Sequence, residues 1–282
     1  MKSIKHIAFL FLLLSSSSCM DEFLKEAPED RFVIGNFYSS QSDAEAAVTA
    51  VYRKLYDIYE RNMFILNDLP ADTEKNGLGM PNQYLQNLEY LRHTSENQFT
   101  RIMWQHNYDG IARANTAIIN IPAIEMDETI KARLIGEAKF LRALYYFNLV
   151  RFYGDVPLIL KLESVDDALG PRIASAEIYQ QIINDLMEAE SSLPEIYGEN
   201  DLGRATKGAA KILLGKVYLT MKDFNKSAEK LAEVINNEGD YGYGLHDDYR
   251  DNWRPATETG KEMVFGIEFM DPPGNGNSAM VL

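Results

Sequence analysis

One nine-residue stretch occurs twice in this chain and constrains its fold more than any other feature. Residues 138–146 are AKFLRALYY and residues 210–218 are AKILLGKVY, so the two stretches align without gaps at an offset of 72 residues. Apolar residues recur in both at the spacing of an amphipathic helix. A small residue, Ala143 or Gly215, stands three positions before the last tyrosine. Such a residue lets a partner helix approach closely, while the aromatic ring fills the space above it.

This pattern resembles a tetratricopeptide helix pair. The second copy continues with a turn at Asp223 and with apolar residues on a return helix, namely Ala228, Leu231 and Val234. It departs from the repeat at Lys222 and Ser227, where Gly and Ala are usual. Because two units are fewer than a free-standing solenoid needs, we expect them to pack on other helices.

Caps and apolar periodicity predict six helices. We expect them at residues 42–60, 99–121, 127–153, 175–193, 206–222 and 225–237. Ser42, Asp127 and Thr206 are the predicted caps, while Gly154 and Pro194 end two of the helices. Residues 67–98 are predicted to be irregular, 155–160 extended, and 263–269 a short strand. The expected fold class is all-α, mainly helical, with tetratricopeptide-like helix pairs and long irregular loops.

The chain begins with a secretory leader that ends at its single cysteine. Lys2 and Lys5 precede the apolar run IAFLFLLL, and four serines lead to Cys19. Eight apolar residues span about 12 Å as a helix, which is too short for a hydrocarbon core of about 30 Å. Lipoprotein processing needs a cysteine at this place, since acyl chains such as palmitate are attached to it. An incidental cysteine in a cleaved or disordered leader is the alternative.

These signals predict three regions. Residues 1–18 form a lipoprotein signal peptide, residues 19–40 an extended tether that starts at the lipidated Cys19, and residues 41–282 a helical domain. Several acyl chains give stable membrane anchoring where one would be marginal.

The composition is strongly acidic. The chain has 42 acidic and 28 basic residues, a formal net charge of -14. Nucleic acid is therefore excluded as a partner attracted by charge. A single cysteine leaves no disulfide, so an apolar core must hold the chain together. The 16 tyrosines suit surfaces that are apolar and hydrogen-bonding at once.

The sequence shows no motif for a cofactor or a metal. His93, His106 and His246 have no partner at metal-ligand spacing, and no nucleophile elbow, Walker loop or dinucleotide fingerprint occurs. We expect no cofactor, no metal and no enzymatic activity.

Two acidic clusters leave alternatives open. Asp68 with Asp72, or Asp247, Asp248 and Asp251, could supply a hydrolase pair. The second cluster could also hold Ca²⁺, although it lacks the EF-hand order of ligands. Solvated acidic surface is the competing interpretation of both.

The longest motif points to a known family. Residues 137–158, EAKFLRALYYFNLVRFYGDVPL, resemble a signature of the SusD/RagB family of nutrient-binding outer-membrane lipoproteins. Supporting motifs follow in family order: residues 43–52, then Trp104, Tyr108, Ile111 and Asn115, then residues 203–206. The resemblance spans nearly all of the chain behind the leader. Family members run on for about as long again, so we expect the C-terminal part of the family fold to be missing here.

The resemblance implies a SusD-like glycan-binding protein rather than an enzyme. Such proteins are anchored by lipid in the outer membrane of Bacteroidetes, exposed at the cell surface. They deliver oligosaccharides, or sometimes peptides, to a SusC-type TonB-dependent β-barrel transporter, which the tetratricopeptide face contacts. Ser16 departs from the usual leucine of the lipidation motif, and residues 20–22 resemble the signal for surface export.

Two other functions remain open beside this one. The first is a tetratricopeptide-type scaffold lipoprotein that binds only protein partners. The second is an all-α polysaccharide hydrolase that uses Asp68 and Asp72.

Candidate ligand contacts lie just before the second predicted helix. Glycans present flat C–H faces and hydroxyl groups, so their sites need aromatic rings and hydrogen-bonding side chains. The candidates are Arg61, Asn76, Asn82, Tyr84 and Tyr90. Alternatively, Tyr84 and Tyr90 pack this loop onto the core.

Two further aromatic positions bear on the site. Trp104 and Tyr108 lie on a helical stripe, so we expect them in the core. Starch-binding family members carry a tryptophan and an amide just after an Asn-x-Leu-Pro-x-Asp run. Here that run, residues 67–72, is followed by no aromatic residue before Tyr84, so starch is not implied.

Overall fold

A computed structural model describes residues 37–77, 82–161, 167, 169–198, 201–254, 257 and 260–267, and the backbone of 280–281. The chain divides into two units, Met1–Tyr38 and Ser39–Leu282. The leader, Cys19 and most of the expected tether lie outside the described residues. In the part that is described, no helix combines the length and apolar character needed to cross a membrane.

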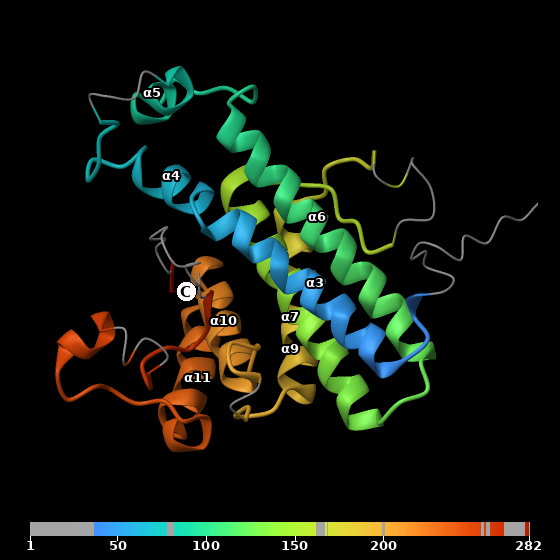
Figure 1. The fold of residues 1–282 in the computed structure, drawn as a ribbon. Coiled ribbons are helices and arrows are strands. Elements are labelled where there is room, and N and C mark those ends of the chain that lie inside the picture. Colours follow the sequence, from blue (N-terminus) through green and yellow to red (C-terminus); the bar gives the residue numbers. More distant parts are fainter. Residues whose placement is uncertain are drawn as a thin grey trace, which may run out of the picture. The chain divides into compact units, whose positions relative to one another are not determined.

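The second unit is built from helices (Figure 1). Its long helices are α3 (Gln41–Tyr59), α6 (Gln98–Asn120), α7 (Glu128–Tyr153), α9 (Ser175–Ser192), α10 (Lys207–Thr220) and α11 (Phe224–Ile235). Its short helices are α4 (Asn62–Asp68), α5 (Gln83–Glu89) and the 3₁₀ turns η2 (Ile121–Ala123), η4 (Glu238–Tyr241) and η5 (Tyr249–Trp253). Strand β1 (Gly266–Ile267) pairs antiparallel with β2 (Met280–Val281). The prediction of an all-α fold is confirmed.

Most helix boundaries follow the predicted caps. Asp127 accepts hydrogen bonds from two backbone amides of α7, Thr206 accepts one from α10, and Gly154 ends α7 with a φ of 67°. The first cap is a correction: Ser40, not Ser42, caps α3. Ser40 has extended backbone, and the Asp43 carboxylate accepts from the Ser40 amide at 2.8 Å, which completes the capping box.

The long helices pack in sequence order. Helix α3 lies on α6, α6 on α7, α7 on α9, α9 on α10, and α10 on α11. Helix α7 is buried on all sides from Phe140 to Val150, because α3, α6 and α9 all cover it. The main core is the cluster of buried residues that these helices share.

Two predictions about packing can now be compared with the structure. A Cβ atom added to Gly215 would lie 2.7 Å from the Leu231 side chain, so the predicted close approach of α11 is confirmed. Trp104 and Tyr108 are only partly buried, at the edge of the core. The Tyr108 hydroxyl donates to the Pro157 carbonyl at 2.8 Å, in the segment that follows α7.

The main core contains charged groups that periodicity did not reveal. Arg142 of α7 donates to both carboxylate oxygens of Asp185 on α9, at 2.7 and 2.8 Å. It also donates to Asn115 of α6 at 2.8 Å. Glu137, which is fully buried, accepts from Arg133 and Arg204. These bonds satisfy the buried charges and join three helices.

The prediction that residues 67–98 are irregular is wrong in part. They contain α5, whose Leu85 and Leu88 join a separate small cluster with Ile65, Leu69 and Phe99. We call residues 62–77 and 82–99 the α5 lobe. The expected strand at residues 263–269 is present only as β1, and residues 268 and 269 lie outside the described part.

Candidate functional site

Three of the five candidate ligand residues lie on or beside α5. The Asn82 side chain caps this helix, since its oxygen accepts from the amides of Tyr84 at 2.9 Å and Leu85 at 3.4 Å. Tyr90 forms the other end. The Asn97 side chain donates to the Tyr84 carbonyl at 2.9 Å and ties α5 to the start of α6. Asn82 and Asn97 therefore both hold the first turn of the short helix.

The two tyrosine rings of α5 are exposed. Tyr84 is 44% exposed and Tyr90 is 60% exposed, so neither ring is packed into the core. The Arg92 guanidinium lies 5.7 Å from the centroid of the Tyr90 ring. This arrangement offers aromatic faces with a hydrogen-bond donor beside them, which suits the C–H face and hydroxyl groups of a sugar.

The remaining two candidates differ in their relation to α5. The backbone amide of Asn76 donates to the Glu89 carboxylate at 3.3 Å, which brings this part of the loop to the end of α5. Arg61 lies exposed before the first residue of α4, and among the described residues no hydrogen bond or ion pair joins it to α5. The structure therefore groups four candidates and leaves Arg61 apart.

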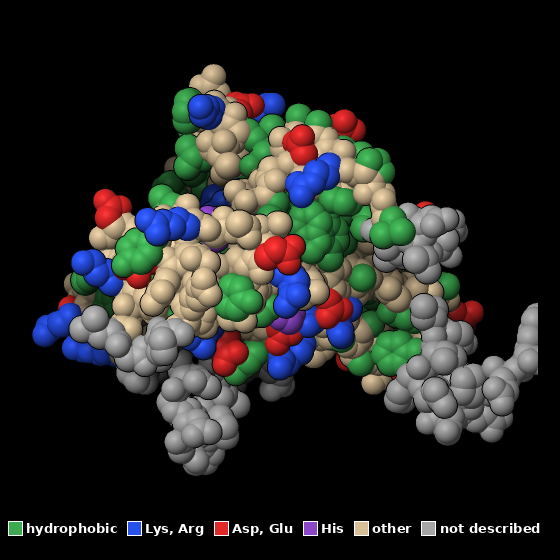
Figure 2. Space-filling model, turned by 90° about the horizontal axis from the view of Figure 1, so that it is seen from above, with side chains coloured by type: hydrophobic (Ala, Val, Ile, Leu, Met, Phe, Trp, Pro, Cys, Tyr) green, Lys and Arg blue, Asp and Glu red, His purple; other side chains and the backbone are tan. Residues whose placement is uncertain are grey.

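Sequence reasoning missed two exposed apolar residues of the α5 lobe. Phe64 is 42% exposed on α4, and Leu91 is 68% exposed just after α5. Four consecutive apolar residues, 63–66, had to place one side chain outward on a helix, which was a usable signal for Phe64. Leu91 has a φ of 52°, a left-handed conformation that sequence did not indicate. The side of the unit that carries α5 faces the reader in Figure 2, where hydrophobic, basic and acidic side chains are mixed.

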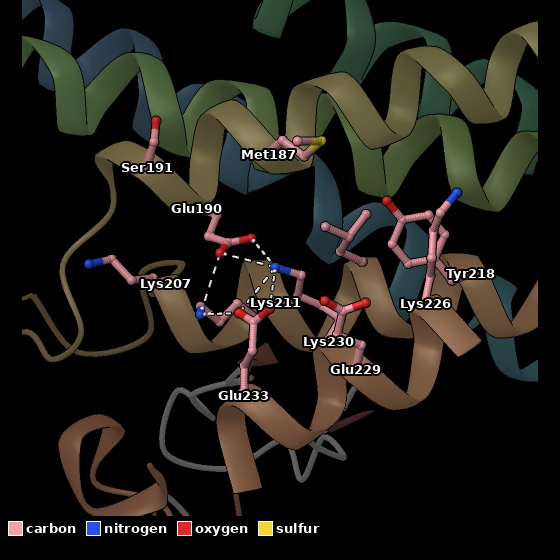
Figure 3. Close-up of a pocket in the computed structure, with 11 residues that line it drawn as sticks. Met187, Glu190, Ser191, Lys207, Lys211, Tyr218, Lys226, Glu229, Lys230 and Glu233 are labelled. Atoms are coloured by element: carbon pink, nitrogen blue, oxygen red, sulfur yellow. Dashed lines mark hydrogen bonds and ion pairs between the residues drawn. The ribbon is translucent and has the colours of Figure 1, made fainter. Parts of the chain in front are cut away.

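A second surface lies between α9, α10 and α11. It is an open cavity of about 570 Å³, which we call the α9–α11 groove (Figure 3). Its lining residues are Met187, Glu190, Ser191, Lys207, Lys211, Leu214, Tyr218, Lys226, Glu229, Lys230 and Glu233.

The floor of this groove holds a ring of alternating charges. Glu190 lies 3.4 Å from Lys211 and 3.2 Å from Lys230, and Glu233 pairs with both lysines. Burial alone would lower the pKa of Lys211, but Glu233 and Glu190 raise it above its ordinary value. Both lysines therefore stay charged and paired. With Met187 and Tyr218 beside it, the groove is a mixed polar and apolar surface of the kind found in protein interfaces.

The other candidate sites do not assemble into a recognisable centre. Asp248 is paired with Arg250 at 2.7 Å and Asp251 with Arg254 at 2.6 Å, so both acids belong to surface ion pairs. Asp68 ends α4, and Asp72 is exposed in the turn that follows. Over the described residues, no three His, Cys, Asp or Glu side chains are placed to hold a metal ion.

Comparisons with known proteins agree on one family. Residues 22–219 match the family described as "Starch-binding associating with outer membrane", SusD-like. SusD-like protein P2 of Formosa agariphila is 31% identical over 271 residues, which cover 94% of this chain and 52% of that protein. Starch-binding protein SusD of Bacteroides thetaiotaomicron is 26% identical over 185 residues, which cover 64% of this chain and 32% of that protein.

A solved structure supports the same conclusion. A laminarin-binding SusD-like protein superposes with a TM-score of 0.75 at 31% identity, covering 82% of this chain and 51% of that one. This chain spans about half the length of the similar proteins P2 and the laminarin-binding protein.

Proposed function

The chain belongs to the SusD-like family, and from this we propose that it is a cell-surface glycan-binding lipoprotein that delivers its ligand to a SusC-type TonB-dependent transporter. One observation carries the proposal beyond the family: the exposed rings of Tyr84 and Tyr90 on α5, a helix whose first turn is held by Asn82 and Asn97. Exposed aromatic rings on a supported element are what a protein needs to stack against sugars.

The ligand class is an oligosaccharide or a polysaccharide. The solved neighbour at 31% identity is named for laminarin, so laminarin is the first polymer to test. Starch is the second, because the family description names it. The absence of an aromatic residue between Asp72 and Tyr84 argues against a starch-type stacking site.

Affinity electrophoresis tests the binding role. The chain from Met20 onward is run through gels that contain laminarin, starch, xylan or a host glycan, with circular dichroism on the same sample. We expect one polymer class to retard the protein while the helical signal is intact. A well-folded sample that no polymer retards would contradict the proposal.

Tyrosine variants locate the site. Tyr84→Ala and Tyr90→Ala should each weaken binding about tenfold, which corresponds to about 1.4 kcal/mol. Tyr249→Ala is the matched control, since this tyrosine is 72% exposed in η5, outside the α5 lobe. The melting temperatures should stay unchanged. A large drop in stability with unchanged affinity would instead make Tyr84 a structural residue.

The α9–α11 groove is proposed as the surface that contacts the transporter. Its exposed Met187 and its ring of paired charges support this assignment, because such a surface offers an apolar contact within a polar rim. Met187→Arg should reduce copurification of the barrel while glycan retardation is unchanged. Copurification without any glycan binding would favour the protein-only scaffold instead.

The lipid anchor and the region boundaries complete the proposal. Residues 1–18 are the signal peptide, Cys19 carries the acyl chains, residues 19–40 are the tether, and residues 41–282 are the N-terminal helical domain of the SusD-like fold. Cys19→Ala should abolish palmitate labelling and release the protein from the outer membrane. Labelling that persists in this variant would overturn the anchor.

A further inference from the structure

A third cavity lies between α7 and α10, apart from both surfaces described above. Its volume is about 120 Å³, and we call it the α7–α10 pocket. Its lining residues are Tyr59, Phe140, Leu144, Phe147, Asn148, Arg151, Ala209, Ile212, Leu213, Lys216, Val264 and Phe265. It exists because α7 and α10 each pack on α9 and make few contacts with one another.

The interior of this pocket accepts an apolar group. Its one uncharged polar side chain apart from Tyr59 is Asn148, which is bonded to Tyr59 and Asn107. An apolar cavity of about 150 Å³ is known to hold a benzene molecule. At about 120 Å³ the α7–α10 pocket is somewhat smaller, so it has room for a branched aliphatic side chain or for part of an aromatic ring.

Two positive charges lie at the pocket without a partner. Arg151 and Lys216 are both exposed, and neither forms an ion pair with any residue of the described part. Arg151 rests 4.9 Å from the centroid of the Phe147 ring, which holds its charge beside the apolar lining. In a chain with a formal net charge of -14, unpaired cations next to an apolar cavity mark a place for an anion.

The site extends beyond the pocket along α10. Ile212, Lys216 and Leu219 lie four and three positions apart, so they share one face of that helix. Leu219 is 51% exposed, one turn beyond Lys216. An apolar pocket, a pair of cations and a further apolar contact in one row fit an extended chain better than a compact ligand.

We propose that the α7–α10 pocket is an anchor site for a polypeptide segment that places one aromatic or branched aliphatic side chain in the cavity and an adjacent carboxylate at Arg151 and Lys216. Stacked helix pairs bind extended partners on the surfaces formed between successive units. The apolar side chain gains burial, and the carboxylate neutralises two charges that line the same pocket. The proposal is independent of glycan binding on the α5 lobe.

A labelled pentapeptide with phenylalanine between two acidic residues tests the site on the full chain. Fluorescence anisotropy should show binding that weakens as the salt concentration rises. A matched peptide with Asn and Gln in place of the acids should bind at least about tenfold more weakly, as should one with Ala in place of Phe.

Variants identify the residues. The double variant Arg151→Gln with Lys216→Gln should bind the acidic peptide at least about tenfold more weakly. Ile212→Trp should prevent peptide binding, because the larger side chain fills the pocket. The double variant Arg53→Gln with Arg250→Gln is the control, because it removes equal charge from exposed side chains on α3 and η5, outside the cavities described above. Retardation by glycan should be unchanged in all of them.

Three results would overturn the proposal. The first is equal binding of the acidic and the neutral peptide, and the second is no binding at millimolar peptide to a protein that still binds glycan. The third is a change of oligomeric state in the Arg151→Gln and Lys216→Gln variant, which would make the face a contact between copies of this chain.

Discussion

The main core and the α5 lobe are built from the same kinds of residue but differ in how they are held. The main core joins five long helices through buried side chains from Val51 to Phe265. The α5 lobe has its own small cluster of buried apolar residues, Ile65, Leu69, Leu85, Leu88 and Phe99, while its Met63 belongs to the main core. A small cluster under a short helix opens at lower free energy than a core shared by many helices.

Under the proposed function, this difference separates the region that sets stability from the region that binds the ligand. Tyr84 and Tyr90 lie on an element whose own cluster is small, so their surroundings can change without a change in the main core. Relatives that share the helices can therefore differ in the ligand that they bind.

The largest expected effect breaks the main core. Asp185→Ala leaves the buried Arg142 without its carboxylate, so the free energy of unfolding should fall by about 3–5 kcal/mol. Urea denaturation followed by circular dichroism measures the loss. The double variant Arg142→Met with Asp185→Leu should recover most of it, because no charge is then left unpaired. A loss below about 1 kcal/mol in Asp185→Ala would show that the pair is solvated.

A truncation in each region tests whether the two unfold separately. Leu88→Ala and Leu186→Ala each remove a buried leucine, at a cost of about 2–5 kcal/mol where the site is closely packed. Leu186→Ala should lower the global unfolding midpoint. Leu88→Ala should abolish glycan retardation and raise hydrogen exchange in residues 83–89 alone. Equal shifts of the global midpoint would contradict the distinction.

A glycine substitution sharpens the account of helix packing. Gly215→Ala puts a methyl group 2.7 Å from Leu231, so it should cost about 1–3 kcal/mol by overpacking α10 against α11. Gly77→Ala is the control in the loop that leads to α5, since no atom of the described residues lies within 4 Å of its added Cβ. Adding Leu231→Ala should relieve the clash. If Gly215→Ala is as stable as the wild type, α11 is free to move outward.

The smallest expected effect is a dependence on pH. Burial and the nearby Lys54 lower the pKa of His106, against the pull of Asp57 and Asp109. The neutral imidazole is thus favoured in the folded state. Its stabilisation is complete above pH 6.5 and is lost as the pH falls through the lowered pKa. His106→Gln should therefore reduce the change in the free energy of unfolding between pH 7 and pH 5. An unchanged pH dependence would show that other groups cause it.

Sequence reasoning succeeded where a single residue marks the end of a helix. Asp127, Gly154 and Thr206 mark helix ends in the structure because caps act through local backbone geometry. The cap of α3 was misplaced by two residues, since Ser40 and Ser42 are both able to cap and only the Asp43 contact distinguishes them.

The same reasoning failed where structure depends on distant residues. Helix α5 has only two buried apolar positions, Leu85 and Leu88, which is too few for a periodic signal. The bidentate pair of Arg142 and Asp185 joins residues 43 positions apart, and no local pattern encodes it. The bond from the Asn97 side chain to the Tyr84 carbonyl likewise joins residues 13 positions apart, which no periodic pattern links.

One hydrogen bond sets an order of events during synthesis. The hydroxyl of Tyr52 on α3 accepts from the amide of Ala205, which lies 153 residues further along the chain. A chain that is made from its N-terminus cannot form this bond until more than two thirds of it has emerged. The contacts of α3 with α6 and α7 involve earlier residues, so they can form before the contact of Tyr52 with Ala205.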